Sequence, residues 1–262
     1  MWYQLGRRNR SELIFFYGHA LRAADLAALD AHGYTWEQFP AEWLVHVGFG
    51  SGVPLEDRKA IADVIDDHRE DFLKYAPLGE AAFSIPPANH PFSLTRREYE
   101  KMRGTGSRSL SRPLTISTLA SWAKLPLFAR IVDRLRKEIP GLDVELLGPQ
   151  DVGRLFSDST SIRLSPLGIS PADPLNHLAF LATMSGVFAE TVPLDEIARI
   201  AVLNNTSQFN RAVKSIEQRI VDERRIIPIA HFPGVVASAP GLTRDESIAY
   251  TWGIQAWAYR LN

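Results

Sequence analysis

A strand–helix–strand unit in the middle of the chain constrains the fold more than any other feature. Residues 114–118 and 143–147 are short apolar runs that predict strands, and residues 125–139 between them predict an amphipathic helix. Pro140 and Gly141 end that helix. A helix that connects two short strands favours a parallel strand pair with a crossover connection. The sequence therefore predicts an α/β fold in which helices cover a sheet.

The rest of the chain continues this mixture of strands and helices. Gly48, Gly50 and Gly52 are expected to break the strand that precedes them, and Gly33 is expected to end a helix. Strands are predicted at 12–17, 42–49, 161–169, 226–230 and 235–238, with a Pro-Gly turn at 233–234. Helices are predicted at 20–31, 54–76, 150–156, 174–188 and twice within 194–220, and residues 77–112 are predicted to form a loop with a short helix.

Composition excludes several classes of protein. The chain has 262 residues, and its formal net charge of −1 gives no global field that favours nucleic acid or an anionic membrane. It has no cysteine, which excludes disulfides, thiolate catalysis and cysteine-ligated zinc. No apolar run reaches the roughly 18 residues that a membrane span needs. The first ten residues lack the apolar core of a signal peptide, so the chain as written is not expected to enter a secretory pathway by itself.

Motifs for catalysis or metal binding are absent from the sequence. None of the seven histidines has another three or four residues away, so no helical metal pair exists. There is no Gly-x-Ser-x-Gly elbow, no Gly-x-Gly-x-x-Gly and no phosphate-binding loop. The acid pairs at 195–196 and 222–223 fit solvated helix faces better than acid–base dyads. We therefore expect a protein that is not an enzyme, with no catalytic residues, no metal and no cofactor.

Four segments carry a more specific pattern. Residues 54–61 read Pro-Leu-Glu-Asp-Arg-Lys-Ala-Ile after a strand that ends in Gly-Phe-Gly, and residues 141–146 read Gly-Leu-Asp-Val-Glu-Leu. Residues 172–174 read Ala-Asp-Pro. Near the C-terminus, a charged helix at 216–225 passes directly into Ile-Ile-Pro-Ile-Ala-His-Phe.

The order of these segments resembles the second lobe of the family 5 extracellular solute-binding proteins, the peptide- and nickel-type receptors of ABC importers. The resemblance implies a periplasmic-binding-protein-like type II lobe, a mixed sheet flanked by helices, spanning 1–262 as a single C-terminal lobe. It covers nearly all of this chain but only about half of a typical member. It implies a peptide or other small solute as ligand, an N-terminal lobe and an ABC permease as partners, and a periplasmic or other extracytoplasmic location. It implies neither nucleic-acid binding by this domain nor membrane insertion.

One position departs from the peptide receptors of that family. Their cleft strand ends in Trp-x-x-Asp-Tyr, and the aspartate pairs with the amino group of the peptide. Alignment on Pro174 places Ser170 at the aspartate and Leu167 at the tryptophan. The carboxylate is missing at that register, although Asp173 lies close by in the sequence.

The candidate ligand-binding residues lie at strand ends and on the cleft strand. Ligands of open α/β sheets bind beyond the carboxyl ends of the strands. Serine and arginine side chains can hold carboxylates or carbonyls, and aromatic rings can stack on apolar ligand surface. The simpler interpretation makes the aromatic residues core and the arginine part of an ion pair. The predicted set is Ser117, Ser121, Trp122, Arg163, Ser165, Ser170, Asp173, His231 and Phe232.

The sequence is also compatible with two other functions. The chain could be the ligand-sensing domain of a transcriptional regulator with the same fold, which a helix-turn-helix in the parent gene would identify. It could also be an enzyme of unrecognised type, for which a ligand bonded to an acid or a histidine in a closed pocket would be the evidence. The aromatic tail at 250–259 predicts packing or an apolar surface for another lobe.

Overall fold

The fold is built on one eight-stranded mixed sheet. The computed structural model describes residues 4–5, 13–103, 108–157, 162–169, 192–244 and 259–261. The strand order is β1-β2-β8-β3-β7-β5-β6, and β4 pairs with β8 beside this path. The strands are β1 (Gln4–Leu5), β2 (Leu13–Tyr17), β3 (Thr35–Phe49), β4 (Glu80–Ala81), β5 (Leu114–Leu119), β6 (Leu142–Leu147), β7 (Ile162–Gly168) and β8 (Ile226–Ser238), while β9 (Leu242–Arg244) and β10 (Tyr259–Leu261) form a separate pair.

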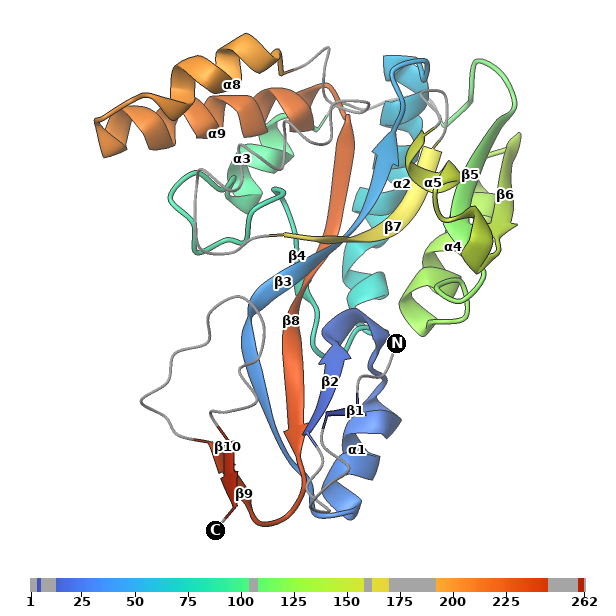
Figure 1. Ribbon diagram of the computed structural model, residues 1–262. Coiled ribbons are helices and arrows are strands. Elements are labelled where there is room, and N and C mark those ends of the chain that lie inside the picture. Colours follow the sequence, from blue (N-terminus) through green and yellow to red (C-terminus); the bar gives the residue numbers. More distant parts are fainter. Residues whose placement is uncertain are drawn as a thin grey trace.

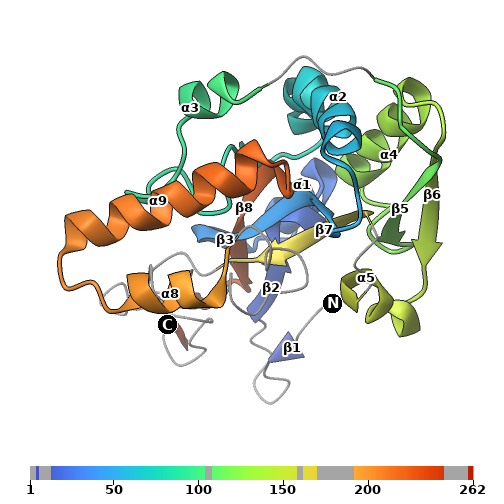
Figure 2. The same ribbon diagram turned by 90° about the horizontal axis from the view of Figure 1, so that it is seen from above.

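Helices cover this sheet on both sides (Figures 1 and 2). The α-helices of the described residues are α1 (Ala23–Ala31), α2 (Leu55–Leu73), α3 (Arg96–Lys101), α4 (Pro126–Glu138), α5 (Arg154–Ser157), α8 (Leu194–Ala201) and α9 (Thr206–Asp222), with short 3-10 turns η1 (Gly18–Ala20) and η2 (Pro149–Asp151). The predicted α/β class, a mixed sheet flanked by helices, is confirmed. The predicted helix at 174–188 lies outside the described residues.

The predicted strand–helix–strand unit is confirmed in full. β5 and β6 are parallel and in register from Leu114↔Leu142 to Leu119↔Leu147, and α4 makes the crossover between them. Pro126 stands at the first turn of α4, where its missing N–H costs no hydrogen bond.

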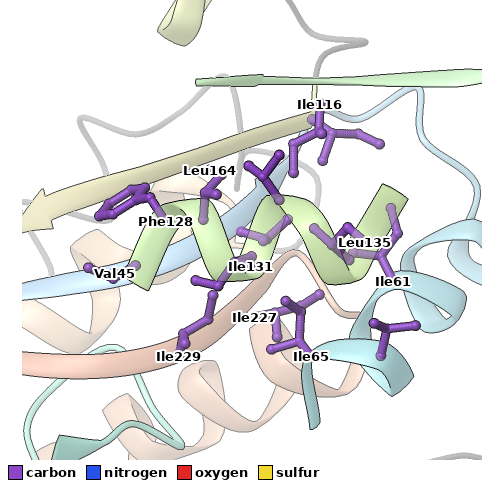
Figure 3. Close-up of a cluster of buried hydrophobic side chains, with 14 of the residues drawn as sticks. Val45, Ile61, Ile65, Ile116, Phe128, Ile131, Leu135, Leu164, Ile227 and Ile229 are labelled. Carbon is purple, nitrogen blue, oxygen red and sulfur yellow. The ribbon is translucent and has the colours of Figure 1, made fainter. Parts of the chain in front are cut away.

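The main core lies between α2, α4 and one face of the sheet. Ile61 and Ile65 of α2 and Ile131 of α4 are fully buried there. Figure 3 shows them meeting the β-branched side chains of the central strands, among them Ile116 and Ile227. Burial of each such side chain contributes about 1.5–3 kcal/mol.

The opposite face of the sheet carries a second core beneath α8 and α9. Ile197 and Ile200 of α8 and Val213 of α9 are buried together with Leu44 and Leu167 from the sheet. Figure 2 shows α8 and α9 side by side. The predicted division of this region near residues 204–205 is confirmed, because the Asn205 side chain accepts a hydrogen bond from the Gln208 N–H at 3.0 Å and so caps α9.

The predicted turn at Pro233–Gly234 is wrong. β8 runs without a break past both residues, paired with β2 on one side and β3 on the other. Register shifts between Phe39 and Trp43 on β3 absorb the proline. Gly234 is needed for another reason: a Cβ there would lie 1.9 Å from the Phe39 ring. The two residues therefore mark an irregular but continuous strand.

The predicted break at Gly48 is also wrong, because this residue pairs inside β3 with Ile226 and Arg163. The strand ends at Phe49, as predicted, before a turn at 51–53. Gly33 does follow the end of α1 as predicted, with a φ of 73° that suits glycine.

A buried arginine of α2 holds the part of the predicted irregular segment that runs from β4 to α3. Arg69 Nη1 donates to the carbonyls of Ala82 (2.6 Å), Pro228 and Ile229 (3.1 Å). Its Nη2 donates to Asp66 Oδ1 at 2.6 Å and to the Tyr99 hydroxyl of α3 at 3.2 Å. One side chain thereby joins α2, β8, α3 and the loop that contains β4.

Candidate functional site

Three parallel strands end at a common edge of the sheet, which we call the carboxyl edge. β5 is parallel to both β6 and β7, and these strands end at Leu119, Leu147 and Gly168. The first two residues of β7, Ile162 and Arg163, pair with Ile116 and Ser117 of β5. Because β5 ends two residues later while β7 runs on to Gly168, β7 continues past the end of β5. Ligands of open α/β sheets bind at such an edge.

Ser121 and Trp122 lie at the carboxyl edge, as predicted. They stand in the turn between β5 and α4, which the hydrogen bonds from Ala120 N to Leu147 O (2.9 Å) and from Ala123 N to Leu119 O (3.0 Å) hold in place. Ser121 is exposed and Trp122 is half-buried. The indole packs against the main core and against a small cluster around Leu119. Trp122 is thus fixed on one side and open on the other.

Ser117, Arg163 and Ser165 come together on the sheet face opposite α2 and α4, and all three are buried. Arg163 stands between Ser117 of β5 and Gly48 of β3, while Ser165 pairs with His46. The Ser117 hydroxyl donates to Glu145 Oε2 at 3.1 Å. The strand register therefore builds a buried polar cluster from residues far apart in the chain.

Gly48 makes room for the arginine in this cluster. A Cβ at position 48 would lie 2.9 Å from Arg163 Nε and 3.3 Å from its Cζ. The guanidinium therefore lies across the backbone of β3 at a place where any other residue would push it away.

Arg163 carries a positive charge within this cluster at neutral pH. Burial lowers the pKa of Arg163 to about 10, which still leaves it protonated. Burial, and next the charge of Arg163, lower the pKa of His46 to about 3, so that imidazole is neutral. A buried guanidinium beside a serine hydroxyl can bind a carboxylate or carbonyl oxygen.

His231 and Phe232 lie on β8, on opposite faces of the sheet. His231 is buried and its Nε2 lies 3.0 Å from the Ile85 carbonyl, and burial lowers the pKa of the imidazole to about 4. Phe232 is 1% exposed within the main core. The chain's own residues cover both side chains, and their contact with ligand stays a prediction.

The remaining predicted site residues, Ser170 and Asp173, lie outside the described residues. In the part of the chain that the structure describes, no group of three or more histidine, aspartate or glutamate side chains is arranged to hold a metal ion.

An aromatic group at the end of β7 was not predicted from the sequence. Trp43 pairs with Gly168 across the β3–β7 ladder, and its ring centroid lies 4.5 Å from that of Tyr17 and 5.3 Å from that of His19. The three rings come from β3, β2 and η1, so no local sequence motif contains them. His46 and Gly48 were missed for the same reason, since only strand pairing places them beside Arg163.

Comparison with known proteins identifies the fold. The sequence matches no family model and no curated protein. Among solved structures, the ABC transporter substrate-binding protein CtaP of Listeria monocytogenes matches with a TM-score of 0.65 at 16% identity, over 90% of this chain and 52% of that one. NikA of Brucella suis, in complex with Fe(III)-EDTA, matches with a TM-score of 0.64 at 15% identity, over 91% and 54%.

A third match is the dipeptide-binding protein of a Pseudoalteromonas species in complex with Met-Leu, with a TM-score of 0.64 at 17% identity, over 85% of this chain and 49% of that one. The chain thus spans about half the length of the solved structures it matches. Within the described residues, every helix is too short or too polar to cross a membrane. The resemblance predicted from the sequence is confirmed at the level of the fold, and the chain has the periplasmic-binding-protein-like fold of one half of these substrate-binding transport proteins.

Proposed function

We propose that this chain is one lobe, the second, of a two-lobe receptor that binds a small solute, such as an oligopeptide, for an ABC importer outside the cytoplasm. Its role is binding rather than catalysis. Its partners are a first lobe, which closes over the solute, and the permease that receives it. Hinged closure of two lobes on a ligand is a common form of domain movement.

The observation that carries this proposal is the combination of coverage and geometry. The fold matches solute-binding proteins over about nine tenths of this chain but only about half of theirs. The half that is present has a carboxyl edge with an exposed serine and a half-buried tryptophan, Ser121 and Trp122. A second lobe facing this edge would enclose a solute between them.

We assign two roles to the residues of this lobe. Ser121 and Trp122 provide a hydroxyl and an apolar ring surface at the edge itself. Arg163 and Ser165 lie behind the edge and supply positive charge and a hydroxyl to the polar end of the solute. Ser117, Ser170, Asp173, His231 and Phe232 remain further candidates from the sequence.

Calorimetry with mixed oligopeptides tests this proposal. Half a cleft buries much less of a ligand than an enclosed pocket does, so we expect the chain alone to bind no more tightly than about 100 µM. Trp122→Ala should weaken that binding further. Leu194→Ala, which removes an exposed apolar side chain on α8, is the matched control and should leave it unchanged. Nanomolar binding by the chain alone would contradict the half-receptor proposal.

A further inference from the structure

Three aromatic rings from β2, η1 and β3 form a continuous group beside the end of β7. We call this group, which consists of Tyr17, His19 and Trp43, the aromatic platform. The Tyr17 and Trp43 rings meet edge to face at an interplanar angle of 63°. The Tyr17 and His19 rings are nearly parallel, at 7°, with centroids 5.8 Å apart. The centroid distances of these two pairs, 4.5 Å and 5.8 Å, lie within the range of favourable aromatic pairing.

Backbone pairing holds the platform in place. Tyr17 is the last residue of β2 and pairs with Gly234 of β8, while Trp43 is held between β7 and β8. Gly18 lets the chain approach β8 closely, because a Cβ there would lie 2.5 Å from the Pro233 carbonyl oxygen. This close approach places His19 next to the Trp43 ring. The platform is therefore formed before any ligand arrives.

The platform offers ligand-binding surface of two kinds. Tyr17 is 37% exposed and Trp43 is half-buried, so both rings keep apolar surface open to solvent. His19 is only 7% exposed, yet its buried Nδ1 has no hydrogen-bond partner among the described residues. Burial is the largest cause that lowers the pKa of His19 to about 4, so the imidazole is neutral at pH 7. A buried polar atom without a partner is costly, and a ligand can supply the missing hydrogen bond.

The platform stands at the carboxyl edge. The Trp43 ring lies 3.7 Å from the point where Gly168, the exposed last residue of β7, would carry a Cβ. Successive side chains of a strand point to opposite faces, so Trp43 lies on the face opposite the one that carries His46 and Gly48. The platform is therefore separate from the cluster around Arg163.

We propose that the aromatic platform is a binding subsite for an aromatic side chain of a peptide solute, with His19 hydrogen-bonding to a polar group of that solute. This inference rests on the proposed function and names the class of solute. Stacking on the Tyr17 and Trp43 rings recognises the flat aromatic side chain. An aliphatic side chain of similar size cannot make this stacking interaction. Loss of one ring contact corresponds to binding about threefold to tenfold weaker.

Fluorine NMR of the full chain labelled with 5-fluorotryptophan tests the subsite. The chain has six tryptophans, and Trp43 and Trp122 are assigned by substitution with phenylalanine. Three tripeptides are titrated to millimolar concentration: tri-alanine, and its analogues with leucine or phenylalanine in the centre. We expect the phenylalanine peptide to shift the Trp43 resonance and to bind threefold or more tightly than the leucine peptide.

Variants make the test specific to the platform. Tyr17→Ala should reduce the preference for phenylalanine, and Tyr17→Phe should keep it, because the ring remains. Tyr75→Ala removes a similarly exposed ring from the turn that follows α2 and should change neither the binding of the peptides nor the preference for phenylalanine. Trp36, whose Nε1 donates to Asp30 at 3.0 Å, provides a resonance that should not move.

The outcomes separate this subsite from the proposed function. If peptides shift Trp122 but leave Trp43 unchanged, or if leucine and phenylalanine peptides bind equally, the subsite is refuted and the receptor role stands. If no peptide shifts either resonance, the oligopeptide receptor role fails together with the subsite.

Discussion

Replacing Arg69 with methionine should destabilise this fold more than most single substitutions. Arg69 is 4% exposed, and its guanidinium reaches three backbone carbonyls, the Asp66 carboxylate and the Tyr99 hydroxyl. Its Cζ also lies 5.0 Å from the centroid of the Phe83 ring. Methionine retains much of the volume of the arginine side chain but none of the five N–H donors of its guanidinium group.

The magnitude follows from what the substitution leaves behind. The Asp66 side chain is 4% exposed, so without Arg69 its carboxylate is a buried charge that has lost its cation. Breaking a buried ion pair from one side costs about 3–5 kcal/mol. The Ile229 carbonyl keeps the bond from Ala82 N at 3.1 Å, but the Pro228 carbonyl loses the hydrogen bond from Arg69. We expect a total of about 4 kcal/mol, a large part of the roughly 5–15 kcal/mol by which domains are stable.

Urea unfolding measures this loss as a lower midpoint at unchanged m value. The double variant Arg69→Met/Asp66→Leu should recover part of the loss, because no unpaired charge remains. Arg199→Met is the matched control: its side chain is 74% exposed beside Asp195, and such pairs are worth about 0.3–0.5 kcal/mol. A loss below about 1 kcal/mol for Arg69→Met, or strict additivity in the double variant, would refute the reasoning.

Three further substitutions test other parts of the structure. Gly48→Val should lower the free energy of unfolding by about 2 kcal/mol, because its Cβ meets Arg163 at 2.9 Å; an unchanged urea midpoint would contradict the packing described. Gly234→Ala should cost about 3 kcal/mol or prevent folding, since its Cβ would lie 1.9 Å from the Phe39 ring, and Phe39→Ala should partly rescue it; circular dichroism melting of both variants decides. The pKa of His46 is about 3 in the folded state against an ordinary 6.5, so its contribution is complete above pH 6.5 and is lost as the pH falls toward 3. Between pH 6 and 4 the free energy of unfolding should therefore fall more steeply in the native chain than in His46→Leu, and the difference in slope should be about 1 kcal/mol per pH unit. Equal slopes in the two proteins would contradict the burial of a neutral His46.

Local patterns predicted the regular elements well where one pattern dominated. The helix at 125–139 has a single apolar stripe and a Pro-Gly stop, and the structure has α4 at Pro126–Glu138. Pro233 and Gly234 misled for a physical reason. Both favour turns in isolated sequence, but here pairing with β2 and β3 on two sides outweighs local preference. Tertiary pairing of this kind is invisible in a short window of sequence.

The candidate site was predictable only in part. Ser121 and Trp122 follow a recognisable strand, so the rule for carboxyl ends found them. Tyr17 belongs to the aromatic platform, and His46 lies in the buried cluster around Arg163. Both groups depend on the register between strands that are far apart in sequence. The sequence predicted a strand at 42–49, which contains Trp43, but did not reveal that this residue stands beside Gly168.

The position of β8 in the sheet has a consequence for biosynthesis. This strand lies between β2 and β3, yet the ribosome completes it about 190 residues after it completes β3, which at about 5–20 residues per second is roughly 10–40 s. During that time both early strands expose unpaired backbone edges that can associate with other chains. A nascent chain of this kind cannot complete its central sheet until β8 has been synthesised, so chaperones that shield those edges should raise the yield of native protein.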